Sequence, residues 1–270
     1  MKELRYNIQY LLKRRELYFS TIVVLAINLI HVILCVNESL RLNSFIEHSY
    51  TAEYQFILYN SQVALNILVI IALPIAFSLI FSDTSWLDKK DKTLNLLYTR
   101  LNYKKNIFVR LCLSIIVTFI ISFIGFFINY LLLRLIYGSG NNITYFQSLA
   151  FNLERGKSWF LDDLRMANPV AFIYAINCTV SISLGLLSGL SYLLSFFVKQ
   201  RVIIYFTPVI FLIMTELIFP IIGLEGISFI NMLQPFSKLS FLNYLFGTLI
   251  LVCMILIILL KNMRKKDVLV

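Results

Sequence analysis

The chain alternates between long apolar runs and shorter polar segments. Six apolar runs are close to or above the roughly 20 residues that a helix needs to cross the hydrocarbon core of a bilayer. The six runs are Tyr18–Val36, Val63–Phe81, Ile107–Tyr137, Pro169–Val198, Val202–Phe219 and Leu242–Leu260. The pattern therefore predicts an all-α polytopic membrane protein, with six transmembrane helices in a single domain that covers residues 1–270.

The third run is longer than one bilayer crossing requires, so its helix is expected to tilt or to protrude. Its apolar centre lies between Arg110 and Arg134. Long basic side chains at the ends of a span can extend to the polar interface. These two arginines are therefore expected to mark the two interfaces.

Basic residues predict the orientation. Lys and Arg are about three times as numerous in the segments on the side of both termini as on the other side, an excess that is typical of the cytoplasmic side. The distribution predicts that both termini are cytoplasmic and that residues 83–106 form a cytoplasmic loop.

Three outer loops follow from this orientation. Residues 37–62 are expected to form a polar loop, and residues 138–168 a longer one with an amphipathic portion. Residues 220–241 are mostly apolar but are interrupted by prolines and glycines. This predicts a broken, re-entrant outer segment whose short helices dip back into the membrane under cover of protein.

The first 17 residues predict an interfacial amphipathic helix. Apolar residues recur there at helical spacing, and the basic residues fall largely at other positions. The apolar positions are Leu4, Ile8, Leu11 and Leu12. A helix with this pattern lies on the inner leaflet, in the plane of the membrane surface.

The cytoplasmic loop contains a second amphipathic stretch. Apolar side chains repeat there at the i, i+3, i+4 and i+7 positions of one helical face, with basic residues on either side. The stripe consists of Leu94, Leu97, Tyr98 and Leu101. Such a face lies against lipid or the protein's own helix ends, or docks into a groove on a soluble protein, and the pattern alone leaves both open.

Composition agrees with a membrane protein. Hydrophobic residues make up 59% of the chain and charged residues 14%, whereas a soluble domain has about 25% charged residues. The net charge of +10 is explained by basic residues beside anionic lipid rather than by nucleic acid. The four cysteines show no metal-ligand spacing, so no metal site is expected.

A few residues within the spans are candidates for function. Glu216 is costly to bury in the outer half of the fifth span, which makes it a candidate for a translocation pathway unless it is hydrated at the interface. His31 is expected to be a hydrogen-bonded structural residue. Ser181, Gly185 and Gly189 recur every four residues, which predicts close helix packing within the chain or between two subunits.

The pattern disfavours an intramembrane enzyme. A rhomboid-type protease needs a G-x-S-G nucleophile and a histidine on a later span. This chain has Gly185-Leu-Leu-Ser188-Gly189, and both histidines, His31 and His48, precede it. The HExxH metal motif is absent.

The stretch DKKDKTLNLLYTRLNYKKNIFVR, residues 88–110, resembles the first cytoplasmic loop of ABC-2-type ABC-transporter permeases. In that family a charged run and a small residue lead into a leucine-rich coupling helix, and a polar turn with a basic residue opens the third span. The corresponding parts here are Asp88–Lys92, Thr93, Leu94–Leu101 and Asn102–Arg110, with Lys92 where the family has a glycine. The order of the elements over the whole chain is also similar.

The resemblance implies the permease subunit of an ATP-driven exporter. In the family two permease subunits, identical or homologous, pair, and each coupling helix contacts a cytoplasmic ABC ATPase. The implied ATPase-coupling residues are Asp88, Lys92, Thr93, Leu94, Leu97, Tyr98, Arg100 and Leu101. Because this chain has no GxxxxGK(S/T) phosphate loop, the separate ATPase is expected to hold ATP and Mg²⁺, and this chain no cofactor.

The resemblance also implies a location and a cargo. A bacterial plasma membrane is expected, and the aromatic-rich spans favour an amphipathic substrate such as a peptide, a lipid-linked molecule or a drug. A non-transporting sensor or immunity protein on the same scaffold is the alternative, because one fold serves many functions.

Overall fold

The computed structural model describes residues 2–42, 52–53, 55–58, 67–90, 103–138, 161, 164, 167–198, 200–224, 226–233 and 240–264. These residues form helices and turns, with no strand among them. Within them, six helical stretches are long and apolar enough to cross a membrane: Arg15–Asn37, Leu68–Asp88, Tyr103–Tyr137, Pro169–Leu194, Arg201–Ile221 and Phe241–Met263. The predicted all-α fold with six candidate spans is confirmed.

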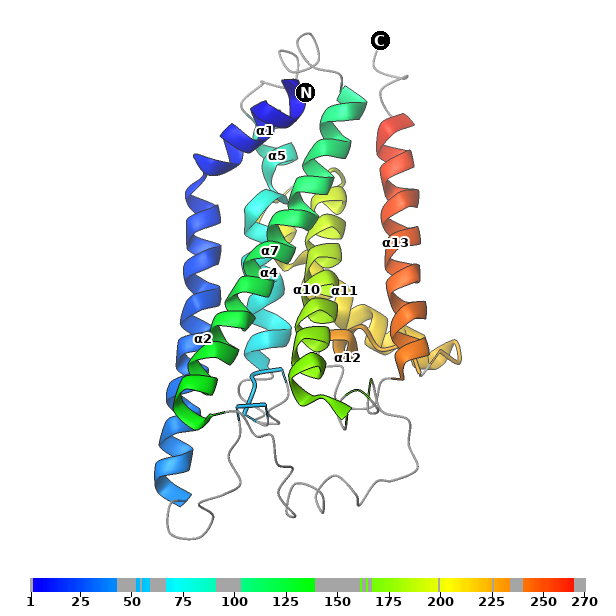
Figure 1. The fold of residues 1–270 in the computed structure, drawn as a ribbon. Helices are drawn as coiled ribbons and strands as arrows, with labels where there is room; N and C mark the ends of the chain where they lie inside the picture. Colours follow the sequence, from blue (N-terminus) through cyan, green and yellow to red (C-terminus); the bar gives the residue numbers. More distant parts are fainter. Residues whose placement is uncertain are drawn as a thin grey trace.

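The spanning helices run side by side in one bundle (Figure 1). They are α2 (Arg15–Leu42), α4 (Leu73–Phe81) between η1 (Leu68–Ala72) and α5 (Thr84–Lys90), α7 (Tyr103–Tyr137), α10 (Pro169–Leu194), α11 (Arg201–Ile221) and α13 (Phe241–Arg264). Two short helices are added: α1 (Lys2–Leu12) and α12 (Phe229–Leu233). The end of the bundle that carries α1, α5 and the last turns of α13 is called the α1 end below.

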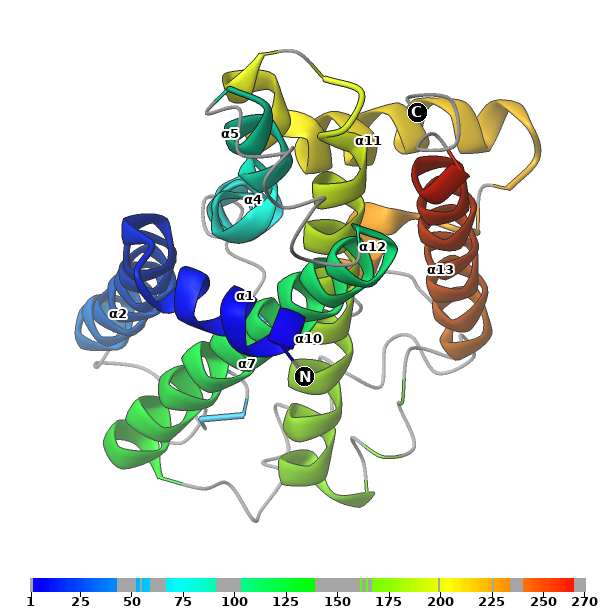
Figure 2. The same cartoon turned by 90° about the horizontal axis from the view of Figure 1, so that it is seen from above.

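Helices α7 and α10 form the centre of the bundle, with α2 and α13 on opposite sides of them (Figure 2). Small residues allow this close packing. A Cβ atom at Gly185 would lie 2.9 Å from the carbonyl oxygen of Ile115, and one at Gly189 would lie 2.8 Å from Ile115 Cγ1. Both glycines therefore pack against α7 within the chain, and Ser181 is buried on the same helix.

We expect Gly185→Ala to lower the free energy of unfolding by about 1–3 kcal/mol, because the new methyl group overpacks against a backbone carbonyl that cannot rotate away. Gly189→Ala should cost less, since only side-chain atoms of Ile115 and Leu111 must move. Adding Ile115→Ala should relieve the second variant but not the first. Thermal unfolding in detergent measures the difference, and equal losses in the two variants would contradict it.

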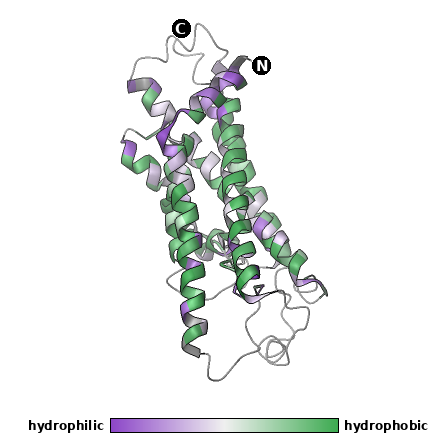
Figure 3. Cartoon of the chain, turned by 60° about the vertical axis from the view of Figure 1, so that its left-hand side comes forward, coloured by the Kyte–Doolittle hydropathy of each residue, from purple (hydrophilic) through white to green (hydrophobic). Residues whose placement is uncertain are grey.

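The outer surface of the bundle is apolar. Exposed leucine, isoleucine and phenylalanine side chains cover most of α11 and α13, of whose apolar windows less than a third is buried. Figure 3 shows hydrophobic residues along the length of the helices and hydrophilic ones gathered toward the α1 end. A surface of this kind suits lipid, not water.

Two helices extend beyond the apolar runs that predicted them. Helix α2 continues to Leu42, past the predicted start of the outer loop at Asn37, and α7 begins at Tyr103. Polar residues at the ends of a span lie at headgroup level or in water, so the helix need not end with its apolar run. With 35 residues, α7 is about 52 Å long at about 1.5 Å per residue.

In the predicted polar outer loop at residues 37–62, the described residues 52–53 and 55–58 form no helix, but they are buried. Phe56 packs edge-on against Tyr130, with ring centroids 6.2 Å apart. Tyr130 Oη donates to Glu53 Oε1 at 3.1 Å. The apolar stretch at residues 56–58 packs against the spanning helices. The polar composition of the surrounding residues gave no indication of this contact. The predicted outer loop at residues 138–168 lies largely outside the described residues.

The predicted helix at residues 1–17 is divided into two. Helix α1 ends at Leu12, and α2 begins at Arg15 after a short break. The expectation that Leu11 lies on the lipid-facing side of this helix is wrong, because its side chain is buried at 4% exposure, and Arg14 after the helix is buried at 6%. Leu11 joins the hydrophobic core instead.

Helix α12 lies within the apolar segment that was predicted to be broken, at residues 220–241. Its residues Phe229, Met232 and Leu233 are buried, and it packs against α10, α11 and α13. A turn at Ile222 and Gly223 separates it from α11, and Gly223 adopts φ +77°, a conformation that glycine takes without strain. These contacts account for the apolar character of the segment.

Candidate functional site

The loop predicted at residues 83–106 is shorter than expected. Its first part is helix α5, and Asp83, Thr84, Ser85 and Asp88 are all buried. Its last part, residues 103–106, belongs to α7. Only residues 91–102 separate α5 from α7. The start of the segment can be buried because its two carboxylates face arginines from other helices.

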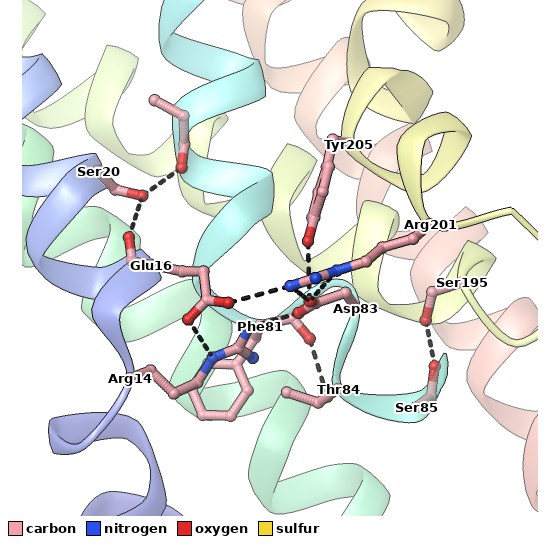
Figure 4. A network of polar contacts seen from close by, with 11 residues as sticks. Arg14, Glu16, Ser20, Phe81, Asp83, Thr84, Ser85, Ser195, Arg201 and Tyr205 are labelled. Carbon is pink, nitrogen blue, oxygen red and sulfur yellow. Dashed lines mark hydrogen bonds and ion pairs between the residues drawn. The ribbon is translucent and has the colours of Figure 1, made fainter. Parts of the chain in front are cut away.

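Four charged residues form a ring, called the charged ring below: Arg14, Glu16, Asp83 and Arg201 (Figure 4). Arg14 Nη2 donates to Asp83 Oδ1 at 2.5 Å, and Arg201 Nε donates to Asp83 Oδ2 at 3.0 Å. On the other side of the ring, Arg201 Nη2 donates to Glu16 Oε1 at 3.0 Å, and Arg14 Nε to Glu16 Oε2 at 3.4 Å. The hydroxyl of Tyr205 donates to Asp83 Oδ2 at 2.8 Å. The charged ring joins the starts of α2 and α11 to the junction of α4 and α5.

The charged ring contains two cations and two carboxylates, so its net charge is zero. Buried charges need such partners. Asp83 is fully buried, and the side chain of Arg14 is 5% exposed. Burial opposes the charge of Arg14, but the Asp83 carboxylate outweighs it through its charge and its hydrogen bond, and the pKa of Arg14 is raised. A buried charge without such a partner would be costly. Arg201 is 38% exposed, so its contribution is screened by solvent.

A second set of contacts, the Asp88 clamp, holds the two ends of the 91–102 segment together. Its members are Asp88, Arg110, Asn7 and Asn106. Asp88 pairs with Arg110 Nη1. Arg110 Nε donates to Asn7 Oδ1 at 2.9 Å, and Asn7 Nδ2 donates to Asn106 Oδ1 at 2.7 Å. The clamp therefore ties α5 to α7, and α7 to α1. The expectation that Arg110 reaches out to an interface is wrong, since it is 2% exposed, whereas Arg134 is exposed as expected.

Tyr10 connects the charged ring to the Asp88 clamp. Its ring centroid is 5.8 Å from the guanidinium carbon of Arg14 and 5.8 Å from that of Arg110. One buried nitrogen on each of these arginines has no hydrogen-bond partner within the described part of the chain. The aromatic face supplies a favourable cation–π contact to both. Burial raises the pKa of Tyr10, so its phenol stays neutral.

Asp83 and helix α5, which directly follows it, together contact most of the helices that end nearby. Besides the charged ring and the clamp, Ser85 Oγ lies 2.5 Å from Ser195 Oγ in the turn after α10 (Figure 4). Short polar contacts therefore join residues 83–88 to α7, to the starts of α2 and α11 and to the turn after α10. Because the charges neutralise one another, the arrangement is suited to mechanical linkage between helices and not to binding a charged ligand.

The residues predicted to couple to an ATPase are mostly outside the described residues, namely Lys92, Thr93, Leu94, Leu97, Tyr98, Arg100 and Leu101. Asp88 is the exception, and the structure places it inside the bundle in the clamp. It therefore lies inside the bundle, just before the rest of the predicted contact region in the sequence.

Glu216 connects α11 to α12. Its Oε1 atom accepts a hydrogen bond of 2.5 Å from Ser228 Oγ and one of 3.3 Å from the backbone N–H of Ile230. Glu216 is partly buried, and Ser228 is buried. The carboxylate satisfies a backbone donor in the first turn of α12, which is a frequent role of acidic side chains at such positions.

Other polar residues inside the bundle bond to one another. Asn129 Nδ2 lies 3.1 Å from His31 Nδ1, and Cys35 Sγ lies 3.4 Å from His31 Nε2. His31 is thus a hydrogen-bonded buried residue, as expected. Ser188 Oγ donates to the carbonyl of Phe77 at 3.2 Å and lies 2.8 Å from Ser114 Oγ, which links three helices.

The charged ring was not predicted from the sequence. Arg14 and Arg201 resemble ordinary basic flanks of spans, and Asp83 opens a stretch rich in charge. The available signal was the position of Asp83, which directly follows the apolar run Val63–Phe81 and Ser82 with no basic neighbour to pair with it. An acidic residue at that depth requires a cation from another helix.

No protein-family model, curated protein or solved structure matches the chain. The class of the protein is defined by its own fold. Six apolar, membrane-length helices in one bundle make it a multi-pass α-helical membrane protein.

Proposed function

We propose that the chain is the membrane-spanning permease subunit of an ATP-driven ABC exporter of the ABC-2 type. In this proposal both termini and the 91–102 segment are cytoplasmic, in a bacterial plasma membrane. A separate ABC ATPase binds the 91–102 segment, with Asp88 inside the bundle just before it, and a second permease subunit, identical or homologous, completes the transporter. The cargo is amphipathic.

One observation carries the proposal. The segment that resembles a coupling helix is flanked by buried polar contacts at both ends: Asp83 and Asp88 precede it, and Asn106 and Arg110 follow it. A surface loop with no mechanical role does not need a buried ion pair to close it, because such pairs stabilise a fold little. A loop that transmits force does need firm attachment to several spans.

Two further features support the proposal. The apolar segment with α12 would be the re-entrant outer segment, and Glu216 would hold it to α11 beside the translocation pathway. The broad apolar faces of α11 and α13 leave room for lipid and for a second permease subunit. Nothing in the described contacts favours the sensor or immunity alternative, which becomes an outcome of the test.

The test replaces Leu97 and Tyr98 by Asp. We expect the tagged chain, purified from its native membrane, to bring down a polypeptide that azido-ATP labels. The double variant should insert normally but lose that partner, because each anchor lost from an apolar groove lowers affinity by about tenfold or more. Association is measured by photolabelling of the co-purified material.

The double variant Asn95→Asp, Thr99→Asp is the matched control, since positions 95 and 99 lie off the predicted stripe and the same two charges there should leave association intact. If the unaltered chain brings down no ATP-binding partner, the permease proposal fails and the sensor alternative is favoured. If the partner binds the Leu97 and Tyr98 variant as well as the unaltered chain, the docking role of the stripe fails.

A further inference from the structure

Helix α1 has two different faces. At about 100° per residue, Asn7 and Leu11 point to one side, and both are buried. Leu4, Ile8 and Leu12 occupy the adjacent arc and are exposed at 45%, 38% and 56%. The side chain of Arg5 follows on the far edge of that arc and is exposed.

This order of faces matches a helix at a membrane surface. A helix in that position turns one face to the protein, the next to acyl chains and the next to headgroups. The exposed apolar arc also continues into α2, where Tyr18 and Phe19 are exposed at 57% and 56%. The surface of α1 is therefore continuous with the lipid-facing surface of the bundle.

The charge of this surface selects the lipid. Arg5, Lys13 and Arg15 are exposed. The nearby carboxylate of Glu16 is already bound by Arg14 and Arg201, so it does not offset them. Glu3 in the first turn of α1 is partly exposed, but the three exposed cations outnumber it and complement a leaflet that carries anionic headgroups.

The buried face of α1 holds the Asp88 clamp. Asn7 bonds to both Arg110 and Asn106, and Tyr10 lies between Arg14 and Arg110. The free energy that three basic side chains gain at an anionic surface is similar in size to that of the hydrogen bonds between α1 and α7. Lipid charge is therefore strong enough to decide how firmly α1 is seated.

We propose that α1 docks on the anionic lipid surface of the membrane, and that the lipid charge controls how firmly Asn7 holds the Asp88 clamp. The inference rests on the proposed orientation, with α1 on the cytoplasmic side, and not on the presence of an ATPase. It makes the strength of the contact between α1 and α7 dependent on the composition of the membrane.

The test compares amide hydrogen exchange of the full chain in nanodiscs of phosphatidylcholine and of phosphatidylcholine mixed equally with phosphatidylglycerol. We expect amides of α1 and of residues 103–110 to exchange about tenfold more slowly in the anionic discs, given the attraction of each basic residue to such a surface. The triple variant Arg5→Gln, Lys13→Gln, Arg15→Gln should lose this dependence on lipid. Lys261→Gln, which removes an exposed cation from α13 at the same end of the bundle, should keep it.

Asn7→Leu separates docking from control of the clamp. In this variant α1 should still respond to phosphatidylglycerol, but residues 103–110 should no longer follow. Equal exchange in the two kinds of disc overturns the proposal, as does lipid dependence that survives in the triple variant. A response of residues 103–110 that persists in the Asn7→Leu variant overturns the link to the clamp. No ATPase is present, so these outcomes are independent of the transport proposal.

Discussion

Asp83→Asn is expected to lower the free energy of unfolding by about 3–5 kcal/mol, the usual cost of removing one partner from a buried ion pair. The variant leaves the guanidinium of Arg14, whose side chain is 5% exposed, without its closest counter-charge. It also weakens the acceptor of Arg201 and of Tyr205. Thermal unfolding of the purified chain in detergent measures the loss.

Two companion variants test the reason for that loss. Glu16→Gln should cost about 1 kcal/mol or less, because its carboxylate and the side chain of Arg201 are partly exposed, at 30% and 38%. Adding Arg14→Met to Asp83→Asn should recover part of the stability, since the unpaired buried cation is then gone. If the double variant is less stable than Asp83→Asn alone, Asp83 does not act by neutralising Arg14.

The spans followed from the sequence because bilayer thickness is a simple constraint on a helix. Any run of about 20 apolar residues satisfies it, and the polar loops between the runs are short enough to bound each one. The constraint says less about where helices end. Helix α2 continues through polar residues to Leu42, since its last turns need no apolar surroundings.

The charged ring could not be predicted in the same way, because it depends on contacts between distant parts of the chain. Arg14 is 69 residues from Asp83, and Arg201 is 118 residues from it. A single sequence shows three charged residues near the ends of three spans, where charge is ordinary. Only the packing of α2, α4 and α11 brings them together. The same packing makes the start of the predicted loop a partly buried helix, α5.

The burial of residues 56–58 was not predicted either, and here the reason is the shortness of the apolar stretch. Phe56 and its neighbours form an apolar stretch too short to span a membrane, surrounded by polar residues. Such a short stretch is compatible with a loop or with a buried segment, and only its contact with Tyr130 decides between them.

Asp88→Asn is expected to lower the free energy of unfolding by about 3 kcal/mol, because Arg110 is then a buried cation without its ion-pair partner. Under the proposed function it should also weaken association with the ATPase, although Leu97 and Tyr98 are unchanged. The clamp joins the two ends of the 91–102 segment. A binding stripe that is held at a single end loses more conformational entropy on docking, which weakens binding. Unfolding and photolabelling of the co-purified partner are measured on the same preparation.

Reversing the clamp distinguishes an ion pair from a general loss of packing. The double variant Asp88→Arg, Arg110→Asp should recover both stability and association, since the pair is restored with opposite polarity. The recovery of stability should be partial, because Asn7 Oδ1 faces position 110 and both amide hydrogens of Asn7 already bond to Asn106 Oδ1 and to the carbonyl of Glu3. Arg110→Asp alone places two carboxylates together and should be the least stable of the set. If the reversed pair recovers stability but not association, then the clamp stabilises the fold without positioning the segment, and the mechanical part of the proposed function is wrong.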